Sequence, residues 1–339
     1  MSNFAAMTIR DNCSLAGRNT FGMDVRADRL IDWSSTDELK NVLKDIERPI
    51  LMIGGGSNLL FMDDYRGTVL HSTVSSIDII GCNDDHIHVR VGSGVVWDDF
   101  VAWCSINGYW GVENLSAIPG EVGASAVQNI GAYGVEAKDV IDTVQTICLA
   151  DGTERDFSNA ECRYSYRQSI FKNELKGLYA VTYVIFTLSK VPQPKLGYGA
   201  LNQEVELMGG PTLENIRKAV ISIRESKLPD PKILGNAGSF FMNPVISEQE
   251  FNIIRNNYPD VPSYPAPDGM IKVPAGWLIE KTGWKGRSLG PAAVYEKQAL
   301  VLVNKGGATG ADIKRLADTV IEDVKQKFGI ILSTEVNYI

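Results

Sequence analysis

Histidine and cysteine are scarce in this sequence of 339 residues. The three histidines are His71, His86 and His88, and the last two alternate along an apparent strand with no acidic residue at a spacing that would complete a metal site. The five cysteines are an odd number without a CxxC pair, so neither a disulfide framework nor a thiolate zinc site is indicated. We therefore expect reduced, mostly buried thiols and no metal.

An excess of positive charge is also absent. Lys and Arg number 33 against 41 Asp and Glu, which gives a formal net charge of −8. Nucleic acids and anionic membranes attract basic proteins, so this balance argues against both as general partners. No apolar run is long enough for a signal peptide or a membrane span, so we expect a cytoplasmic protein without membrane insertion. The length predicts two or three domains.

Glycine is abundant in one nearly uncharged stretch, residues 118–136, which carries Gly120, Gly123, Gly131 and Gly134. Glycine lets backbone N–H groups approach a ligand closely and adopt positive φ, and successive N–H groups of this kind bind anions. We interpret the stretch as a binding surface for a diphosphate. The alternative is a loop of small residues that serves only tight packing.

Another glycine turn, GGGSN at residues 54–58, comes first along the chain and follows an apolar strand predicted at residues 50–53. Leu59 replaces the third glycine of the dinucleotide fingerprint, and no Gly-Lys-Ser/Thr follows. Both a nicotinamide-type Rossmann site and a P-loop kinase site are therefore weakened. What remains is a turn of N–H groups, to which Ser57 and Asn58 can add side-chain donors.

Apolar periodicity and turn signals predict the other elements. Ser35 and Glu38 signal the start of a helix, Asp151 and Gly152 a hairpin turn, and the prolines of KLPDPK a domain boundary. Together these signals predict an α+β fold, in which a cofactor domain precedes a compact second unit. Further helices are expected at residues 97–104, 213–225, 247–257, 275–283 and 313–328, and strands at residues 69–74, 86–94, 179–189, 299–303 and 330–339.

Four side chains could carry chemistry: Arg167, which follows Tyr166, and Ser239, Glu335 and Lys227. Each has an ordinary structural explanation: an arginine stacked on a ring, a serine in a turn, a solvated carboxylate in an edge strand, and a cation at a helix C-terminus. Together they fit the reduction of a C=C bond attached to a carboxylate. That reaction needs a hydride donor, a cation where negative charge builds up, and an acid for the adjacent carbon.

The motifs GGGSNLL, IPGEVGASAVQNIGAYG, YSYRQSIFK, SKLPDPK, GNAGSFF and AGWLIEKTG occur in one order between residues 19 and 335. In this order and spacing they resemble the UDP-N-acetylenolpyruvoylglucosamine reductase family, also called UDP-N-acetylmuramate dehydrogenases. The resemblance implies an FAD-binding fold of the vanillyl-alcohol-oxidase type with an added α/β substrate-binding domain. It implies FAD-binding subdomains at residues 1–70 and 71–226 and a substrate-binding domain at residues 227–339, whose last strand could pack back on the FAD half.

The resemblance also implies a reaction and a set of residues. NADPH would reduce noncovalent FAD, and UDP-N-acetylglucosamine enolpyruvate would then be reduced to UDP-N-acetylmuramate in peptidoglycan precursor synthesis, by a monomer. It implies Ser239 as proton donor, and Arg167 and Glu335 as the residues that stabilise the enolic carboxylate. The cofactor-binding residues that it implies are Gly54, Gly55, Gly56, Ser57, Asn58, Leu59, Ile118, Pro119, Gly120, Gly123, Gln128, Asn129, Gly131 and Tyr133. The substrate-binding residues that it implies are Tyr166, Tyr198 in a lid, Lys227, Asn243, Tyr264 and Gln298, and Tyr133 also matches a substrate-site position.

The sequence departs from the family pattern at two positions. Ala126 replaces a proline in the flavin loop, which costs some loop rigidity, and Met242 replaces a lysine, which removes a cation from near the diphosphate of the substrate. One alternative is a flavin oxidase of the same fold, but such oxidases often tether flavin through His or Cys, and neither glycine loop contains one. The other alternative is a nucleotide-binding regulatory module without turnover, which the presence of all three catalytic side chains disfavours.

Overall fold

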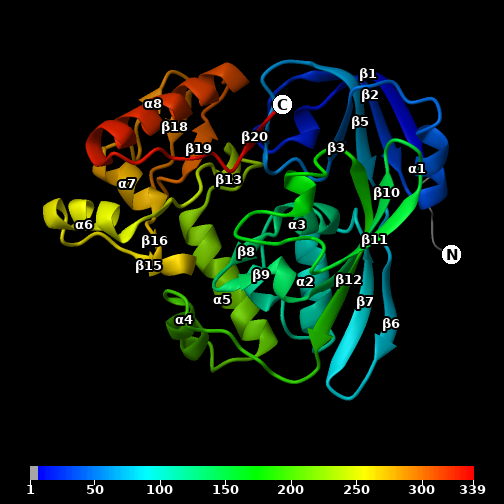
Figure 1. Cartoon of the computed structure of the whole chain (residues 1–339), viewed down its shortest axis with the longest axis horizontal. Coiled ribbons are helices and arrows are strands. Elements are labelled where there is room, and N and C mark those ends of the chain that lie inside the picture. The colour runs from blue at the N-terminus through cyan, green and yellow to red at the C-terminus, as the bar shows by residue number, and fades with distance from the viewer. Residues whose placement is uncertain (1–6) are drawn as a thin grey trace. The chain divides into compact units, whose positions relative to one another are not determined.

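The computed structural model describes residues 7–339, which form two compact units (Figure 1). The first unit contains residues 26–55 and 65–226 together with the described residues up to 13. The second unit contains residues 14–25, 56–64 and 227–339. The chain therefore passes between the units several times, and the turn GGGSN contributes residues to both.

The first unit contains a four-stranded sheet in the order β1-β2-β5-β3. Its strands are β1 (Thr8–Ser14), β2 (Arg26–Trp33), β3 (Ile50–Ile53) and β5 (Tyr65–Ser72). Helix α1 (Thr36–Val42) connects β2 to β3 and begins where the Ser35 side chain accepts the Glu38 N–H. β5 pairs in parallel with both β2 and β3, so the carboxyl ends of these strands lie at one edge of the sheet. The glycine turn after β3 lies at that edge.

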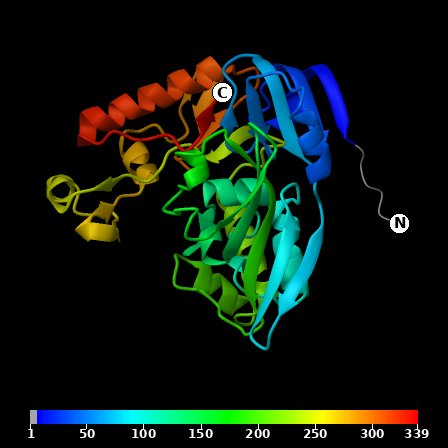
Figure 2. The same ribbon diagram turned by 45° about the vertical axis from the view of Figure 1, so that its right-hand side comes forward.

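The second sheet of this unit is antiparallel and has the order β11-β10-β12-β7-β6. Its strands are β6 (Ile77–Cys82), β7 (His86–Gly92), β10 (Ile141–Cys148), β11 (Glu154–Ser158) and β12 (Tyr179–Ser189). Helices α2 (Trp97–Ile106) and α3 (Val122–Gln128) lie beside this sheet, as Figures 1 and 2 show, and share its core. In that core the ring centroid of Phe100 lies 4.8 Å from that of Phe186. This packing fixes α3, which lies within the glycine-rich stretch at residues 118–136, hereafter the second glycine loop.

Two more helices and a short hairpin complete the first unit. The helices are α4 (Leu201–Leu207) and α5 (Leu213–Lys227), whose last residue is assigned to the second unit, and the hairpin strands are β8 (Gly131–Ala132) and β9 (Val135–Glu136). α5 buries Ile216, Val220 and Ile223, which lie on one face at helical spacing. These residues form a separate core with Trp110, Leu201 and Val205.

The second unit is built on an antiparallel sheet in the order β13-β19-β18-β17. Its strands are β13 (Gly235–Ser239), β17 (Ser288–Leu289), β18 (Ala292–Val294) and β19 (Val301–Asn304). Helix α8 (Gly310–Phe328) packs on β18 and β19, and α7 (Ala275–Lys281) packs on α8. A capping box between Thr309 and Asp312 begins α8, and Gly329, with φ +72°, ends it.

Smaller elements complete the second unit. They are α6 (Glu248–Asn257), the sheet of β14 (Val245–Ile246), β16 (Ile271–Lys272) and β15 (Tyr264–Pro265), and the parallel pair of β4 (Leu59–Leu60) and β20 (Asn337–Tyr338). The last pair places the end of the chain beside the residues that follow the first glycine turn. Among the helices of residues 7–339, none combines the length and the apolar character that a bilayer span requires.

Most predicted helices and strands are confirmed, but two expectations are wrong. The strand predicted at residues 330–339 is reduced to β20, and Glu335 lies in an irregular segment before it. The alternating residues Ile330 and Leu332 are buried as a strand would require, yet Thr334 forms only an isolated bridge with Phe241.

The thiols are not mostly buried: Cys104 and Cys162 are buried, Cys13 and Cys148 are partly buried, and Cys82 is exposed.

Asp98 of α2 joins three parts of the first unit. Its carboxylate accepts hydrogen bonds from Arg217 of α5 at 2.6 and 2.8 Å, and one from the Ala117 N–H at 2.6 Å. Burial alone would raise the pKa of Asp98, but the hydrogen bonds from Arg217 and Ala117 outweigh burial and lower the pKa. Asp98 therefore braces α5 and the start of the second glycine loop.

We expect Asp98→Asn to lower the free energy of unfolding at neutral pH by about 1–3 kcal/mol, because a partly buried Arg217 loses its charged partner. The pKa of Asp98 is lower in the folded state than in the unfolded state. Its stabilising effect is therefore complete above the unfolded value of about 4 and is lost as the pH falls through the folded value. Urea denaturation over this pH range measures both effects. The control is Asp99→Asn, an exposed neighbour in the same helix, and equal stability of the two variants at neutral pH would contradict the prediction.

Candidate active site

Gly54 and Gly55, which begin the first glycine turn (residues 54–58), lie directly against the second glycine loop within the first unit. A Cβ atom built on Gly55 would lie 3.3 Å from Gly120 Cα, and one on Gly54 would lie 3.2 Å from Glu121 Oε2. A side chain at either position would have to displace the neighbouring loop, so close approach favours glycine here. The two glycine-rich stretches of the sequence therefore form one surface.

This surface offers backbone donors. Within residues 7–339, neither Gly54 nor Gly55 donates its N–H to another backbone group. Free N–H groups at a bare turn bind anions such as the phosphates of a dinucleotide. The residues present therefore fit the diphosphate of the cofactor that the motifs imply.

The rest of the first turn belongs to the second unit. Gly56 has φ +64°, and a Cβ atom on it would lie 2.0 Å from the Arg18 carbonyl oxygen. Asn58 donates its side-chain amide to the Glu335 carbonyl oxygen at 3.1 Å, and its own carbonyl accepts the Asn337 N–H at 3.1 Å. Asn58, predicted as a donor to the ligand, therefore also positions the segment that carries Glu335.

Buried polar contacts hold the second glycine loop in place. A Cβ atom on Gly123 would lie 2.7 Å from Ser93 Cβ, so the backbone of α3 packs closely on that residue. Asn129, buried and left-handed with φ +45°, donates its amide to Glu136 Oε2 and to the Ser165 carbonyl oxygen. The predicted cofactor residues of the first unit are Gly54, Gly55, Ile118, Pro119, Gly120, Gly123, Gln128, Asn129, Gly131 and Tyr133, and those of the second unit are Gly56, Ser57, Asn58 and Leu59.

Arg167 lies on the second glycine loop. Its guanidinium donates to the Gly131 carbonyl oxygen at 2.6 Å and to the Asn129 carbonyl oxygen at 3.4 Å. It also lies 5.3 Å from the ring centroid of Tyr166, so the stacked arrangement considered from the sequence is present as well. A φ of +58° is uncommon for arginine and shows that the local structure imposes this conformation. The cation is therefore held in a fixed orientation.

The predicted substrate residues Tyr133 and Tyr198 meet edge to face. Their ring centroids lie 6.2 Å apart with planes at 88°. The amide of Asn114, which is fully buried, donates to the Tyr133 carbonyl oxygen at 2.9 Å and to the Lys195 carbonyl oxygen at 2.8 Å. One buried amide therefore ties the Tyr133 turn to the segment that carries Tyr198. Burial raises the pKa of Tyr133 and keeps its hydroxyl protonated as a donor.

Sequence patterns give no prediction for Arg224 of α5, although it lies near these residues. Burial lowers the pKa of Arg224, the nearby Tyr133 and Asp98 raise it, and the like charge of Arg167 lowers it. A second cation therefore accompanies Arg167 in this part of the first unit. The signal that could have identified it is its place four residues after Val220, on the apolar stripe of α5.

The second unit brings Ser239 and Glu335 together. Ser239 ends β13 opposite Val301 of β19, after Gly238 with φ +67°. The carbonyl oxygen of Phe240, the next residue, accepts the Glu335 N–H at 2.8 Å. The predicted acid and carboxylate therefore lie on adjacent, hydrogen-bonded backbone segments, whereas Arg167 belongs to the first unit.

The other predicted substrate residues also belong to the second unit. Asn243 accepts the Ala275 N–H at 2.9 Å and so meets the start of α7, and Gln298 accepts the Leu300 N–H at 3.3 Å. Lys227 ends α5 and is exposed, and Tyr264 in β15 is exposed as well. Asn243 and Gln298 are partly exposed to solvent.

Comparisons with known proteins match both parts of the chain. A model described as UDP-N-acetylenolpyruvoylglucosamine reductase, C-terminal domain, matches residues 230–339, and one described as FAD binding domain matches residues 27–158. The chain is 52% identical over 328 residues to a UDP-N-acetylenolpyruvoylglucosamine reductase of Bacteroides fragilis, over 96% of this chain and 98% of that protein. It is 51% identical over 337 residues to one of Porphyromonas gingivalis, over 98% of this chain and 100% of that protein.

Two solved structures share the fold. The UDP-N-acetylenolpyruvylglucosamine reductase of Thermus caldophilus aligns with a TM-score of 0.69 at 22% identity, over 98% of this chain and 99% of that one. The 6-hydroxy-D-nicotine oxidase of Arthrobacter nicotinovorans aligns with a TM-score of 0.54 at 15% identity, over 98% of this chain and 88% of that one. At these identities the likeness shows the fold alone.

The glycine surface, the match to an FAD binding domain and the shared fold define an FAD-dependent oxidoreductase with the predicted fold class. Because identity near one half extends over almost the whole of both chains, this chain belongs to the UDP-N-acetylenolpyruvoylglucosamine reductase family. The resemblance found in the motifs is therefore confirmed.

We expect Asn114→Ala to release the segment around Lys195, because its carbonyl loses the buried amide that holds it. Trypsin should then cleave after Lys195 at least about tenfold faster than in the wild type, as a local opening that costs less free energy exposes the bond more often. Mass spectrometry of early digestion products measures the rate. The control is Asn107→Ala, an exposed amide that bonds only to the Trp103 carbonyl within its own helix end. Equal cleavage in both variants would show that Asn114 does not restrain the segment.

Proposed function

We propose that the chain catalyses the NADPH-dependent reduction of UDP-N-acetylglucosamine enolpyruvate to UDP-N-acetylmuramate, a step of bacterial peptidoglycan precursor synthesis. The observation that carries this proposal is the 52% identity to a named reductase over 96% of this chain. The side chains proposed for the reaction are present in the sequence, as Ser239 and Arg167 in two of the motifs and Glu335 near the end of the chain.

FAD, when bound, would supply the hydride chemistry that connects NADPH with the enolpyruvyl group of the substrate. Gly54 and Gly55 would hold its diphosphate through their backbone N–H groups, while the loop around Gly120 and Gly123 would form the other side of the surface. Neither glycine loop contains His or Cys, which supports a noncovalent cofactor.

Ser239 would protonate the carbon next to the one that accepts hydride. A serine hydroxyl is a weak acid, so nearby groups must stabilise the negative charge that its oxygen develops. Glu335 is fixed beside it through the hydrogen bond to the Phe240 carbonyl and would act on the substrate carboxyl group.

Arg167 would stabilise the charge that builds up on the substrate carboxylate as hydride adds. Its guanidinium is already oriented by the carbonyl groups of Gly131 and Asn129. A preoriented cation stabilises a transition state without rearranging during the reaction, and this is the most effective use of a charge in catalysis.

Substrate binding would use Tyr133 and Tyr198, with Tyr198 as a lid residue. The edge-to-face contact of the two rings supports a shared role, because a substrate that orders one ring also orders the other. The remaining residues that we propose for substrate binding are Tyr166, Lys227, Asn243, Tyr264 and Gln298.

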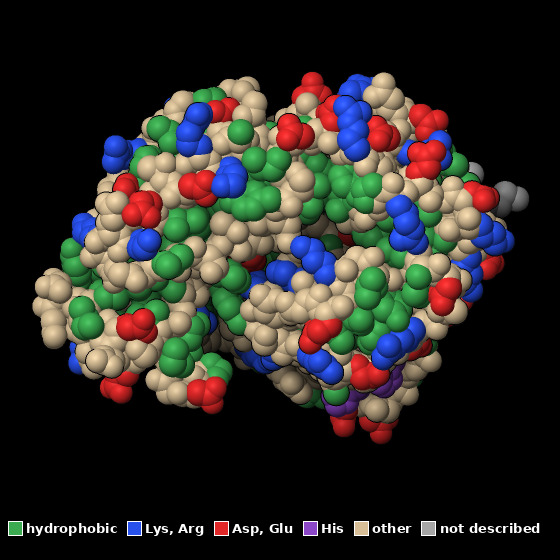
Figure 3. All heavy atoms as spheres, turned by 45° about the horizontal axis from the view of Figure 1, so that its top comes forward, with side chains coloured by type: hydrophobic (Ala, Val, Ile, Leu, Met, Phe, Trp, Pro, Cys, Tyr) green, Lys and Arg blue, Asp and Glu red, His purple; other side chains and the backbone are tan. Residues whose placement is uncertain are grey.

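We also propose a cytoplasmic monomer that binds no nucleic acid, with FAD-binding subdomains at residues 1–70 and 71–226 and a substrate domain at residues 227–339. The net charge of −8 supports the absence of a nucleic-acid partner. Figure 3 shows Lys and Arg interspersed with Asp and Glu on the face drawn, in keeping with that balance.

We expect Ser239→Ala to slow the substrate-dependent half-reaction by about 10²- to 10⁴-fold or more, because the carbon that must be protonated loses its proton donor. The NADPH half-reaction needs no such proton and should keep its wild-type rate. Rapid mixing with NADPH alone, and then with the enolpyruvyl substrate, measures the two steps separately. Ser239→Cys retains a transferable proton and should recover part of the rate, and Ser288→Ala, an exposed serine of the same sheet, is the control. A wild-type rate in Ser239→Ala would assign the proton to another donor.

Arg167→Lys tests the preoriented cation. The change keeps the charge but loses the fork that contacts both carbonyl oxygens, so the substrate half-reaction should slow by about 10²-fold or more while NADPH still reduces the enzyme normally. Arg163→Lys is the matched control, since Arg163 lies four residues earlier in the sequence, also has positive φ, and forms an exposed ion pair with Glu174. Equal slowing of both half-reactions in Arg167→Lys would indicate damage to the flavin site instead.

A further inference from the structure

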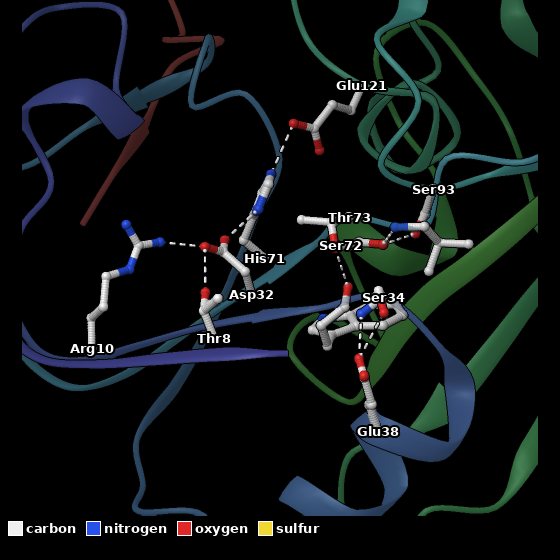
Figure 4. Close-up of polar contacts among 12 residues, drawn as sticks. Thr8, Arg10, Asp32, Ser34, Glu38, His71, Ser72, Thr73, Ser93 and Glu121 are labelled. Carbon is white, nitrogen blue, oxygen red and sulfur yellow. Dashed lines mark hydrogen bonds and ion pairs between the residues drawn. The ribbon is translucent and has the colours of Figure 1, made fainter. Parts of the chain in front are cut away.

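A chain of charged side chains runs through the first unit from β1 to the glycine surface (Figure 4). His71 of β5 lies between two carboxylates: its Nδ1 is 2.7 Å from Asp32 Oδ1 and its Nε2 is 3.0 Å from Glu121 Oε1. Asp32 in turn accepts hydrogen bonds from Arg10 and from the Thr8 hydroxyl. The side chains of His71, Asp32 and Glu121 are nine to eleven per cent exposed, so the histidine and both of its carboxylate partners lie away from bulk water.

The two contacts of His71 determine how many protons the group holds. A carboxylate can only accept, so each contact requires a proton on the ring nitrogen or on the carboxyl group. A neutral imidazole has only one N–H. Two contacts with carboxylates therefore need one proton more than a neutral imidazole and two carboxylates hold. The chain of Arg10, Asp32, His71 and Glu121 thus carries two positive and two negative charges when His71 holds both protons, and it is balanced. Removing His71 would leave the nearly buried carboxylates of Asp32 and Glu121 without the positive charge between them.

Glu121 ends this chain at the glycine surface. It occupies the position before α3, but its side chain does not cap that helix and is turned to His71 instead. The second oxygen, Oε2, lies against the backbone of Gly54, where a Cβ atom would approach it to 3.2 Å. Within residues 7–339 this oxygen accepts no hydrogen bond from the protein. A nearly buried carboxylate oxygen therefore faces the place where the two glycine loops meet.

We propose that Glu121 is an additional FAD-binding residue, whose Oε2 accepts a hydrogen bond from a hydroxyl group of the cofactor, and that His71 and Asp32 are the residues that position it. A carboxylate beside a diphosphate site would repel the ligand if its charge were not compensated. His71 supplies that compensation, so the carboxylate can serve as an acceptor without opposing the phosphates. The role of Glu121 rests on the FAD binding described above and adds a side-chain acceptor to a surface that we otherwise describe through its backbone and side-chain donors.

The test is the equilibrium binding of FAD to the deflavinated full chain, followed by flavin fluorescence. We expect Glu121→Ala to raise the Kd for FAD about 10- to 100-fold, and Glu121→Gln, which keeps an acceptor oxygen, to raise it about 3- to 10-fold. His71→Asn should raise the Kd about tenfold, since it leaves the Glu121 carboxylate uncompensated beside the phosphates. Adding Glu121→Gln to His71→Asn should then restore part of the affinity, which a purely structural role of His71 would not produce.

Glu38→Gln is the matched control. Glu38 is another partly buried carboxylate of the first unit, and it accepts hydrogen bonds from the Ser34 N–H and hydroxyl at 2.7 and 2.9 Å (Figure 4). The replacement of Glu38 should leave the Kd for FAD within about twofold of the wild type, because it changes a comparable carboxylate whose hydrogen bonds are not part of the chain to Glu121.

An unchanged Kd in Glu121→Ala would overturn the role of Glu121. A double variant that binds FAD no better than His71→Asn would overturn the compensating role of His71. Failure of the wild-type chain to bind FAD would overturn the proposed function itself.

Discussion

The close approach of two backbone turns is the constraint on which the first unit depends. Gly55 and Gly120 come so near that a Cβ atom on the first would lie 3.3 Å from the Cα of the second. Such an approach is possible only if β3 ends at the edge where the parallel strands end, and if the core of the antiparallel sheet holds α3 in place. The architecture of both sheets thus serves to present bare N–H groups at one surface.

The two glycine-rich loops have few side chains that could hold them in position by hydrophobic packing. Buried polar groups hold these loops in position instead. Asp98 fixes the start of the second loop through the Ala117 N–H, Asn129 fixes its middle, and Asn114 fixes the Tyr133 turn at its end. Each of these groups makes at least two hydrogen bonds to other parts of the unit, which repays the cost of burying a polar side chain. Variants at these positions should therefore be read as changes in loop geometry before they are read as changes in chemistry.

The sequence predicted the elements whose signals are local. The cap at Ser35, the hairpin at Gly152 and the amphipathic face of α8 all depend on residues within a few positions of one another, and each is present. The strands β1 and β2 were not predicted, because β1 is largely exposed and β2 becomes continuously buried only near its end, so neither shows a clear alternation. The prediction of a strand at residues 330–339 was wrong although the pattern is clear. Ile330 and Leu332 are buried in alternation as in a strand, but no partner strand runs along the whole segment.

The candidate site shows the same division. Glycine motifs and the side chains proposed for catalysis are visible in the sequence, whereas the contacts of Asn114, Arg224 and His71 join residues far apart in the chain.

Asn58 shows why such contacts matter for function. It belongs to the first glycine turn by sequence, yet its amide donates to the Glu335 carbonyl and its carbonyl accepts from Asn337. The Glu335 N–H is bound in turn to the residue after Ser239. The first glycine turn, the segment of Glu335 and the residue after Ser239 are therefore linked by hydrogen bonds within one unit. Because the side-chain amide of Asn58 makes one of these bonds, a substitution at Asn58 would remove a restraint on the segment that carries Glu335, 277 positions away in the chain. The residues proposed for cofactor binding and for substrate chemistry are therefore coupled at this point.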